Sequence, residues 1–62
     1  MSMKATYEIR KMVVREPSIS PAEISVKLGD MGLSASDATI YQIKSQTLIT
    51  MDVMKREGWR KL

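Results

Sequence analysis

The sequence contains no cysteine and no histidine, and these absences exclude several kinds of site. Without cysteine there is no disulfide, and nothing points to an oxidising compartment. A zinc site would have to use carboxylates alone, which zinc sites rarely do. We therefore expect no metal and no cofactor. An enzyme is not expected either, because there is no histidine or cysteine for catalysis and no glycine-rich phosphate loop, and so short a chain has no room for a substrate cleft.

Long apolar runs are also missing. No stretch approaches the ~20 apolar residues that a membrane-spanning helix needs, and the first residues lack the apolar segment of a signal peptide. We expect a soluble, cytoplasmic protein without membrane contacts. A chain of 62 residues forms a single domain, residues 1–62, and so small a domain buries only roughly 60% of its unfolded surface. A well-packed helical core, self-association or both should stabilise it.

The charge is unevenly distributed along the chain. The net charge of +3 divides into +2 for residues 1–16, −2 for residues 17–54 and +3 for residues 55–62. A basic balance weakly favours a polyanionic partner such as DNA. The densest basic cluster lies near the end of the chain and consists of Lys55, Arg56, Arg60 and Lys61. It is expected to be either a solvated tail or a group of cations that binds phosphate.

Three helices are expected, and the first covers about residues 4–15. Apolar residues at spacings of three and four share one face of this segment. They are Ala5, Ile9, Met12 and Val13. Pro17 ends the helix, because the residue before a proline avoids helical geometry.

The second helix, about residues 21–31, has the clearest start signal. Ser20 and Glu23 form a capping box, in which each side chain bonds the other residue's backbone N–H. Pro21 takes the first helical position, where its missing N–H has no cost. Ile19 and Ile24 occupy the two positions of a hydrophobic staple.

Two glycines near the end of this helix are given different roles. Gly29 lies in the last turn and is expected to allow close approach of another helix. Gly32 is expected to adopt the left-handed conformation that ends a helix.

The third helix is expected over about residues 37–57. Ser36 is the favoured N-cap, with Asp37 in the first turn, and Ser34 is the alternative cap. Residues at spacings of three and four again form a stripe. They are Ile40, Ile43, Thr47, Met51 and Met54. A single long helix ending at Gly58 is favoured, and a break between residues 45 and 50 is the alternative.

Residues 20–46 combine a helix, a short turn and a second helix. The turn contains Gly32, and the apolar Leu33 plugs the angle between the helices. This is a helix-turn-helix, a motif whose second helix enters the major groove in DNA-binding proteins. The predicted fold is therefore an all-α, three-helix helix-turn-helix domain with a long third helix and no wing.

A family pattern matches about 25 residues of this unit. Its elements are Ser20, Glu23 and Ile24, followed by Ser36, Thr39, Ile40 and Tyr41. On these residues the chain resembles the winged-helix DNA-binding half of ferric-uptake-regulator-type repressors, and related units of transposases and other bacterial regulators. The metal-binding histidines and cysteines of those repressors are absent here, and the wing has no counterpart.

The resemblance implies a set of DNA contacts. Hydroxyl groups of Ser36, Thr39 and Tyr41 would contact phosphates, Gln42 and Ser45 would read base edges, and Lys44 would neutralise a phosphate. From the first helix, Arg10 and Lys11 are expected to supply further phosphate contacts, although a solvated helix face explains them about as well.

The distal half of the third helix predicts a different kind of contact. Two shorter helices do not cover a helix of this length, so apolar residues on it remain exposed. The expected dimer or partner surface consists of Leu48, Ile49, Met51, Val53 and Met54.

Two functions follow from these patterns. The first is a small DNA-binding regulator, or an accessory factor of a mobile element, that acts as a homodimer through the third helix. The alternative is a protein-interaction module on the same scaffold without DNA binding.

Overall fold

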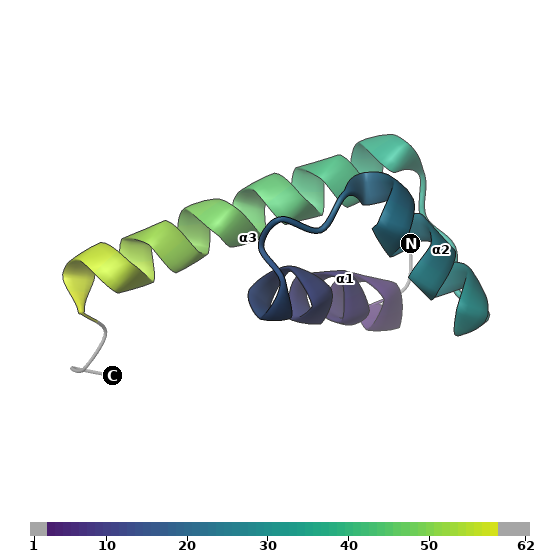
Figure 1. Ribbon diagram of the computed structural model, residues 1–62, viewed down its shortest axis with the longest axis horizontal. Coiled ribbons are helices and arrows are strands. Elements are labelled where there is room, and N and C mark those ends of the chain that lie inside the picture. The colour runs from purple at the N-terminus through teal and green to yellow at the C-terminus, as the bar shows by residue number, and fades with distance from the viewer. Residues whose placement is uncertain (1–2, 59–62) are drawn as a thin grey trace.

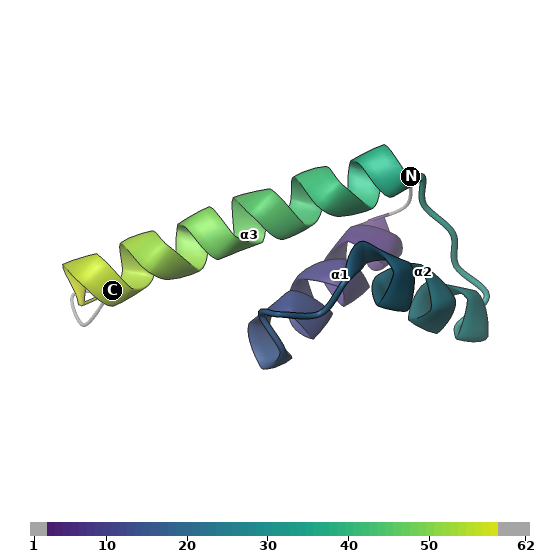
Figure 2. The same ribbon diagram turned by 45° about the horizontal axis from the view of Figure 1, so that its top comes forward.

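The computed structural model describes residues 3–58 as three helices. They are α1 (Met3–Arg15), α2 (Pro21–Asp30) and α3 (Asp37–Glu57). Helices α1 and α2 pack against the N-terminal part of α3, whose distal half extends beyond them (Figure 1, Figure 2). Residues 3–58 contain no strand, so no wing lies within them. The predicted all-α fold with a long third helix is confirmed.

Both predicted N-caps are present. Ser20 Oγ accepts a hydrogen bond from the backbone N–H of Glu23 at 3.2 Å, and Pro21 is the first residue of α2. Ser36 Oγ accepts from the N–H of Thr39 at 3.2 Å. These bonds satisfy N–H groups that have no partner within their helix. Ser36 is therefore the cap of α3, and the alternative of Ser34 is wrong.

Helix α2 ends where the sequence predicts. The N–H of Gly32 bonds the carbonyl of Gly29 at 3.0 Å, and the N–H of Leu33 bonds the carbonyl of Leu28 at 2.8 Å. This is the Schellman pattern. It requires a left-handed residue, and Gly32 has φ of 75°. The turn then directs the half-buried Leu33 against the core.

Gly29 does not have the expected role. A Cβ built at this position meets no atom within 4 Å, so no helix approaches closely there. The glycine is exposed on the surface of α2, and its presence is not explained by packing.

The core lies where the three helices meet. Its fully enclosed members come from each helix and from the segment between α1 and α2. The buried apolar residues are Ala5, Ile9, Met12, Val13, Ile19, Ile24, Leu28, Ile40 and Ile43. The last buried side chain along the chain is Thr47, 7% exposed, among the residues described. The core therefore supports α3 only as far as its middle.

Helix α3 is continuous, so the alternative of a break is wrong. Its threonines lower helix propensity, but their hydroxyls bond carbonyls one turn earlier. Thr47 Oγ1 donates to Ile43 O at 2.7 Å, and Thr50 Oγ1 donates to Gln46 O at 2.9 Å. The helix ends at Gly58, which has φ of 78° and donates its N–H to Met54 O.

The two glycines of the α2 end give a paired stability prediction. Gly29→Ala should raise the free energy of unfolding by about 0.5–1 kcal/mol, because alanine favours the helix and meets no neighbour. Gly32→Ala should lower it by about 1–2 kcal/mol, because an L-residue is strained at positive φ. Urea denaturation of both variants measures the difference. Destabilisation by Gly29→Ala would show that this position is constrained by something other than the contacts described.

Candidate nucleic-acid interface

The N-cap and the first three turns of α3 carry polar side chains that are exposed or half-buried. We call these residues the proximal surface: Ser36, Thr39, Tyr41, Gln42 and Ser45. Tyr41 is 65% exposed, Ser36 and Gln42 are exposed, and Thr39 and Ser45 are half-buried. The structure therefore brings together the five neutral residues of the predicted DNA-contact set.

The hydroxyls of the proximal surface are ordered by the helix cap. Ser36 Oγ donates a hydrogen bond to Thr39 Oγ1 at 2.8 Å while it accepts from the N–H of Thr39. Because Ser36 supplies the proton, the proton of the Thr39 hydroxyl remains available as a donor. A phosphate oxygen is a suitable acceptor for such a donor.

Lys44 has a structural contact that the sequence did not predict. Its Nζ donates to the carbonyl oxygen of Ile19 at 2.6 Å, across 25 positions of the chain. The bond joins α3 to the segment between α1 and α2, and the lysine is half-buried. One of the three N–H groups of the ammonium is therefore used within the domain, and the expected phosphate contact stays a prediction.

The two predicted cations of α1 lie apart from the proximal surface. Lys11 forms an ion pair with Glu8, with 3.1 Å between Nζ and Oε1, and its Nζ lies 5.4 Å from the centre of the Tyr7 ring. Lys11 lines a hollow between α1 and α2. Arg10 is exposed on the other side of α1, beside the distal half of α3.

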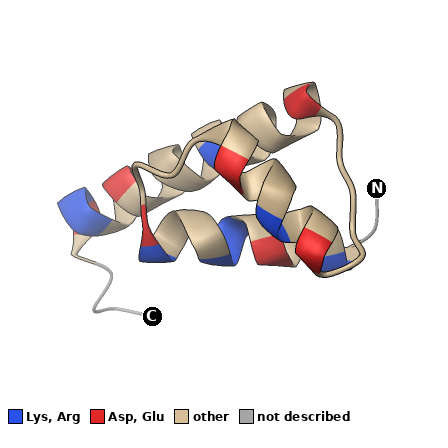
Figure 3. Ribbon diagram, turned by 45° about the vertical axis from the view of Figure 1, so that its right-hand side comes forward, with Lys and Arg blue, Asp and Glu red and all other residues tan. Residues whose placement is uncertain are grey.

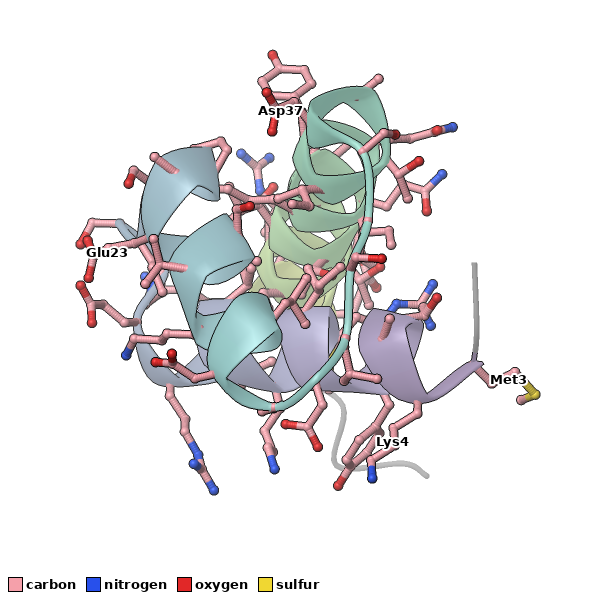
Figure 4. The ribbon with its side chains drawn as sticks, turned by 90° about the vertical axis from the view of Figure 1, so that its right-hand side faces the viewer. Met3, Lys4, Glu23 and Asp37 are labelled. Carbon is pink, nitrogen blue, oxygen red and sulfur yellow. The ribbon has the colours of Figure 1, made fainter. Side chains whose placement is uncertain are left out.

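An acidic residue lies in the first turn of α3 and two basic residues lie in its last turn, with charges of both signs between them (Figure 3). Asp37 at the first position of α3 and Glu23 on α2 both project to solvent, and Lys4 projects from the opposite side of the molecule (Figure 4). At the far end, Arg56 pairs with Asp52 at 3.0 Å. The predicted basic cluster continues to residues 60 and 61, which lie outside the described residues.

The distal half of α3 carries exposed apolar side chains. Ile49 is 64% exposed, Val53 43% and Met54 41%. We call these three residues the distal surface. Leu48 and Met51, which the sequence placed in the same surface, are half-buried and pack against the core instead.

Val14 of α1 was not assigned to any surface from the sequence. It is 56% exposed and shares a shallow hollow with Thr50, Met51 and Met54 of α3. In the sequence Val14 lies next to the apolar stripe of α1, and this position could have indicated that its side chain borders α3. Val14 therefore extends the exposed apolar area from α3 onto α1.

No group of three or more acidic residues among residues 3–58 is arranged to hold a metal ion. None of the helices described is long and apolar enough to cross a membrane. Comparisons with protein-family models, curated proteins and solved structures found no match to this chain.

The Lys44 contact predicts a loss of stability on substitution. Lys44→Met keeps the aliphatic stem but removes the bond to Ile19 O, and should lower the free energy of unfolding by about 1 kcal/mol. Lys27→Met, on the exposed side of α2, is the matched control and should change stability by less than about 0.5 kcal/mol. Thermal or urea unfolding measures both. Equal effects would show that the Lys44 bond contributes no stability of its own.

Proposed function

We propose that this chain is a small DNA-binding protein of the helix-turn-helix class, serving as a transcriptional regulator or as an accessory factor of a mobile element. The observation that carries the proposal is the proximal surface. Exposed and half-buried polar side chains line the N-cap and the first three turns of α3, and a capped turn holds that helix end against α2. In helix-turn-helix proteins this end of the second helix enters the major groove. The resemblance to repressor and transposase units supports the same function.

Four of the five residues of the proximal surface have a chemical role in this proposal, and the fifth, Ser36, orients the Thr39 hydroxyl. Gln42 is exposed and reads a base edge, because its amide pairs bidentately with adenine. Tyr41 and Thr39 donate hydroxyl protons to phosphate oxygens on either side of the groove. Ser45 lies one turn further along and contacts a second base.

The electrostatics support modest affinity for the DNA backbone. Lys44 bonds a carbonyl, Lys11 is paired with Glu8, and Asp37 at the tip of α3 repels phosphate. Non-specific affinity depends on the number of phosphates that cations neutralise. We therefore propose that neutral hydrogen bonds, with only two or three phosphate neutralisations, hold the protein on DNA.

A protein-interaction module on the same scaffold is the second candidate. The observation that favours it is that two lysines bond groups within the domain. Lys44 bonds the carbonyl of Ile19 and Lys11 pairs with Glu8, whereas a DNA-binding protein would direct such cations towards phosphates. In this alternative the exposed apolar residues of α3 form the contact, and the domain has no affinity for DNA.

Selection from a pool of duplexes with 20 randomised base pairs tests the first proposal. The wild-type chain should enrich a short common sequence, and Gln42→Ala should lose the preference at one position of it. Ser18→Ala is the control, because Ser18 is an exposed polar residue in the segment between α1 and α2, outside α3. It should retain the selected sequence. Absence of any enriched sequence, with a folded protein, would favour the protein-interaction module.

The salt dependence of binding to the selected duplex gives a second test. Two or three neutralised phosphates predict an affinity that falls roughly 10- to 40-fold between 50 and 200 mM salt. Fluorescence anisotropy of the labelled duplex measures this change. A loss of a thousandfold or more would contradict the small number of phosphate contacts, and a salt-independent signal would contradict DNA binding itself.

A further inference from the structure

The distal half of α3 has little packing within the domain. The last buried side chain among the described residues is that of Thr47, and beyond it Leu48 and Met51 are only half-buried. Helical segments shorter than ~12–15 residues are marginal in water without packing. Ile49, Thr50 and Val53 are β-branched, which lowers helix propensity further. The Asp52–Arg56 pair is exposed, and exposed pairs stabilise a helix by only a few tenths of a kcal/mol. Packing from outside the domain would therefore stabilise this segment in its helical form.

We propose that the distal half of α3 pairs with the same segment of a second copy of this chain, antiparallel and related by a two-fold axis near residue 51. The contact covers residues 46–56. The apolar centre consists of Ile49 and Val53, with Met54 at its edge. This self-association does not depend on DNA binding.

The residue pattern is complementary to itself in this arrangement. Gln46, Ile49, Val53 and Arg56 follow at spacings of three and four, so they share one outward face of α3. With the axis near residue 51, Ile49 lies opposite Val53 of the second copy. Gln46 lies opposite Arg56 of the second copy, where the amide oxygen of glutamine accepts from the guanidinium. Apolar residues therefore meet at the centre and polar residues at both ends.

A parallel arrangement is less favourable for two reasons. It places Arg56 opposite Arg56 of the second copy, and like charges across a helix pair repel. It also places both sets of α1 and α2 at the same end of the helix pair. These helices lie beside the N-terminal part of α3 (Figure 1, Figure 2), so an antiparallel pair separates them to opposite ends.

A second copy suits this surface better than an unrelated protein. A two-fold pair uses the same patch on both copies, and the pattern from Gln46 to Arg56 is complementary to itself without any additional partner. The proposed contact covers one face of about three helical turns, so we expect it to bury less than the ~800 Å² that each partner contributes to a standard interface. A weak dimer with a micromolar dissociation constant is therefore expected. Small domains without disulfides or metals commonly gain stability through such association.

Cysteine cross-linking tests the direction and register of the pair. The chain has no cysteine, so Ile49→Cys and Val53→Cys each introduce a single thiol. A disulfide needs Cα atoms within about 7 Å, and only residues that face each other meet this limit. An equimolar mixture of the two variants should form the mixed disulfide at least tenfold faster than either variant forms its own. Faster self-linking of Ile49→Cys, or equal rates in all three samples, would overturn the antiparallel arrangement.

Sedimentation equilibrium without DNA tests the association itself. The wild-type chain should shift from monomer to dimer as its concentration rises through the micromolar range. Ile49→Asp should raise the dissociation constant at least tenfold, because it places a carboxylate at the apolar centre. Val26→Asp is the matched control, since Val26 is 65% exposed on α2, and should leave the dissociation constant unchanged. A wild-type chain that stays monomeric at 1 mM, or equal effects of the two aspartates, would overturn the proposal.

Discussion

The hydrophobic core extends only to about the middle of α3, and the two surfaces of that helix depend on this limit. Helix α1 has 13 residues and α3 has 21, so α1 is shorter by about 12 Å at ~1.5 Å per residue. Pro17 fixes the end of α1, and the chain then turns back through Ile19 to begin α2. Both short helices therefore cover the first half of α3 and leave the second half beyond the shared core. The division of α3 into a proximal and a distal surface follows from this difference in length.

The Lys44–Ile19 bond shows how a small domain uses its charged groups. The carbonyl of Ile19 lies beside the start of α2, and Lys44 bonds it from α3. The proximal surface itself consists of neutral hydrogen-bonding groups, with one acidic residue, Asp37, at its tip. Any function at this surface must depend on the geometry of hydroxyl and amide groups more than on charge. This is consistent with sequence-selective contacts and with weak binding to the DNA backbone.

Local signals in the sequence were sufficient to predict the helices and their ends. The caps at Ser20 and Ser36 and the left-handed Gly32 depend on atoms within a few residues, so pattern rules apply to them directly.

Contacts between distant segments were not predictable in this way. The partner of Lys44 is 25 residues away, and a lysine on an α-helix gives no local sign of which carbonyl it will reach. The open space around Gly29 likewise depends on where α3 lies. Helical spacing placed Met51 on the same stripe as Ile43 and Thr47 but did not show how far along α3 the core extends. Met51 and Leu48 were therefore also grouped with Ile49 in the distal contact surface.

Hydrogen exchange measured as a function of protein concentration tests most directly whether the distal half of α3 depends on a second copy. The account predicts that backbone amides from Leu48 to Glu57 exchange rapidly at concentrations where the chain is monomeric. Their protection should rise as the dimer forms, and amides of core residues such as Ile24 should gain only the uniform stabilisation that dimer formation gives the whole domain. Strong protection of residues 48–57 that is independent of concentration would contradict the account, because it would show that the single domain supports its own long helix.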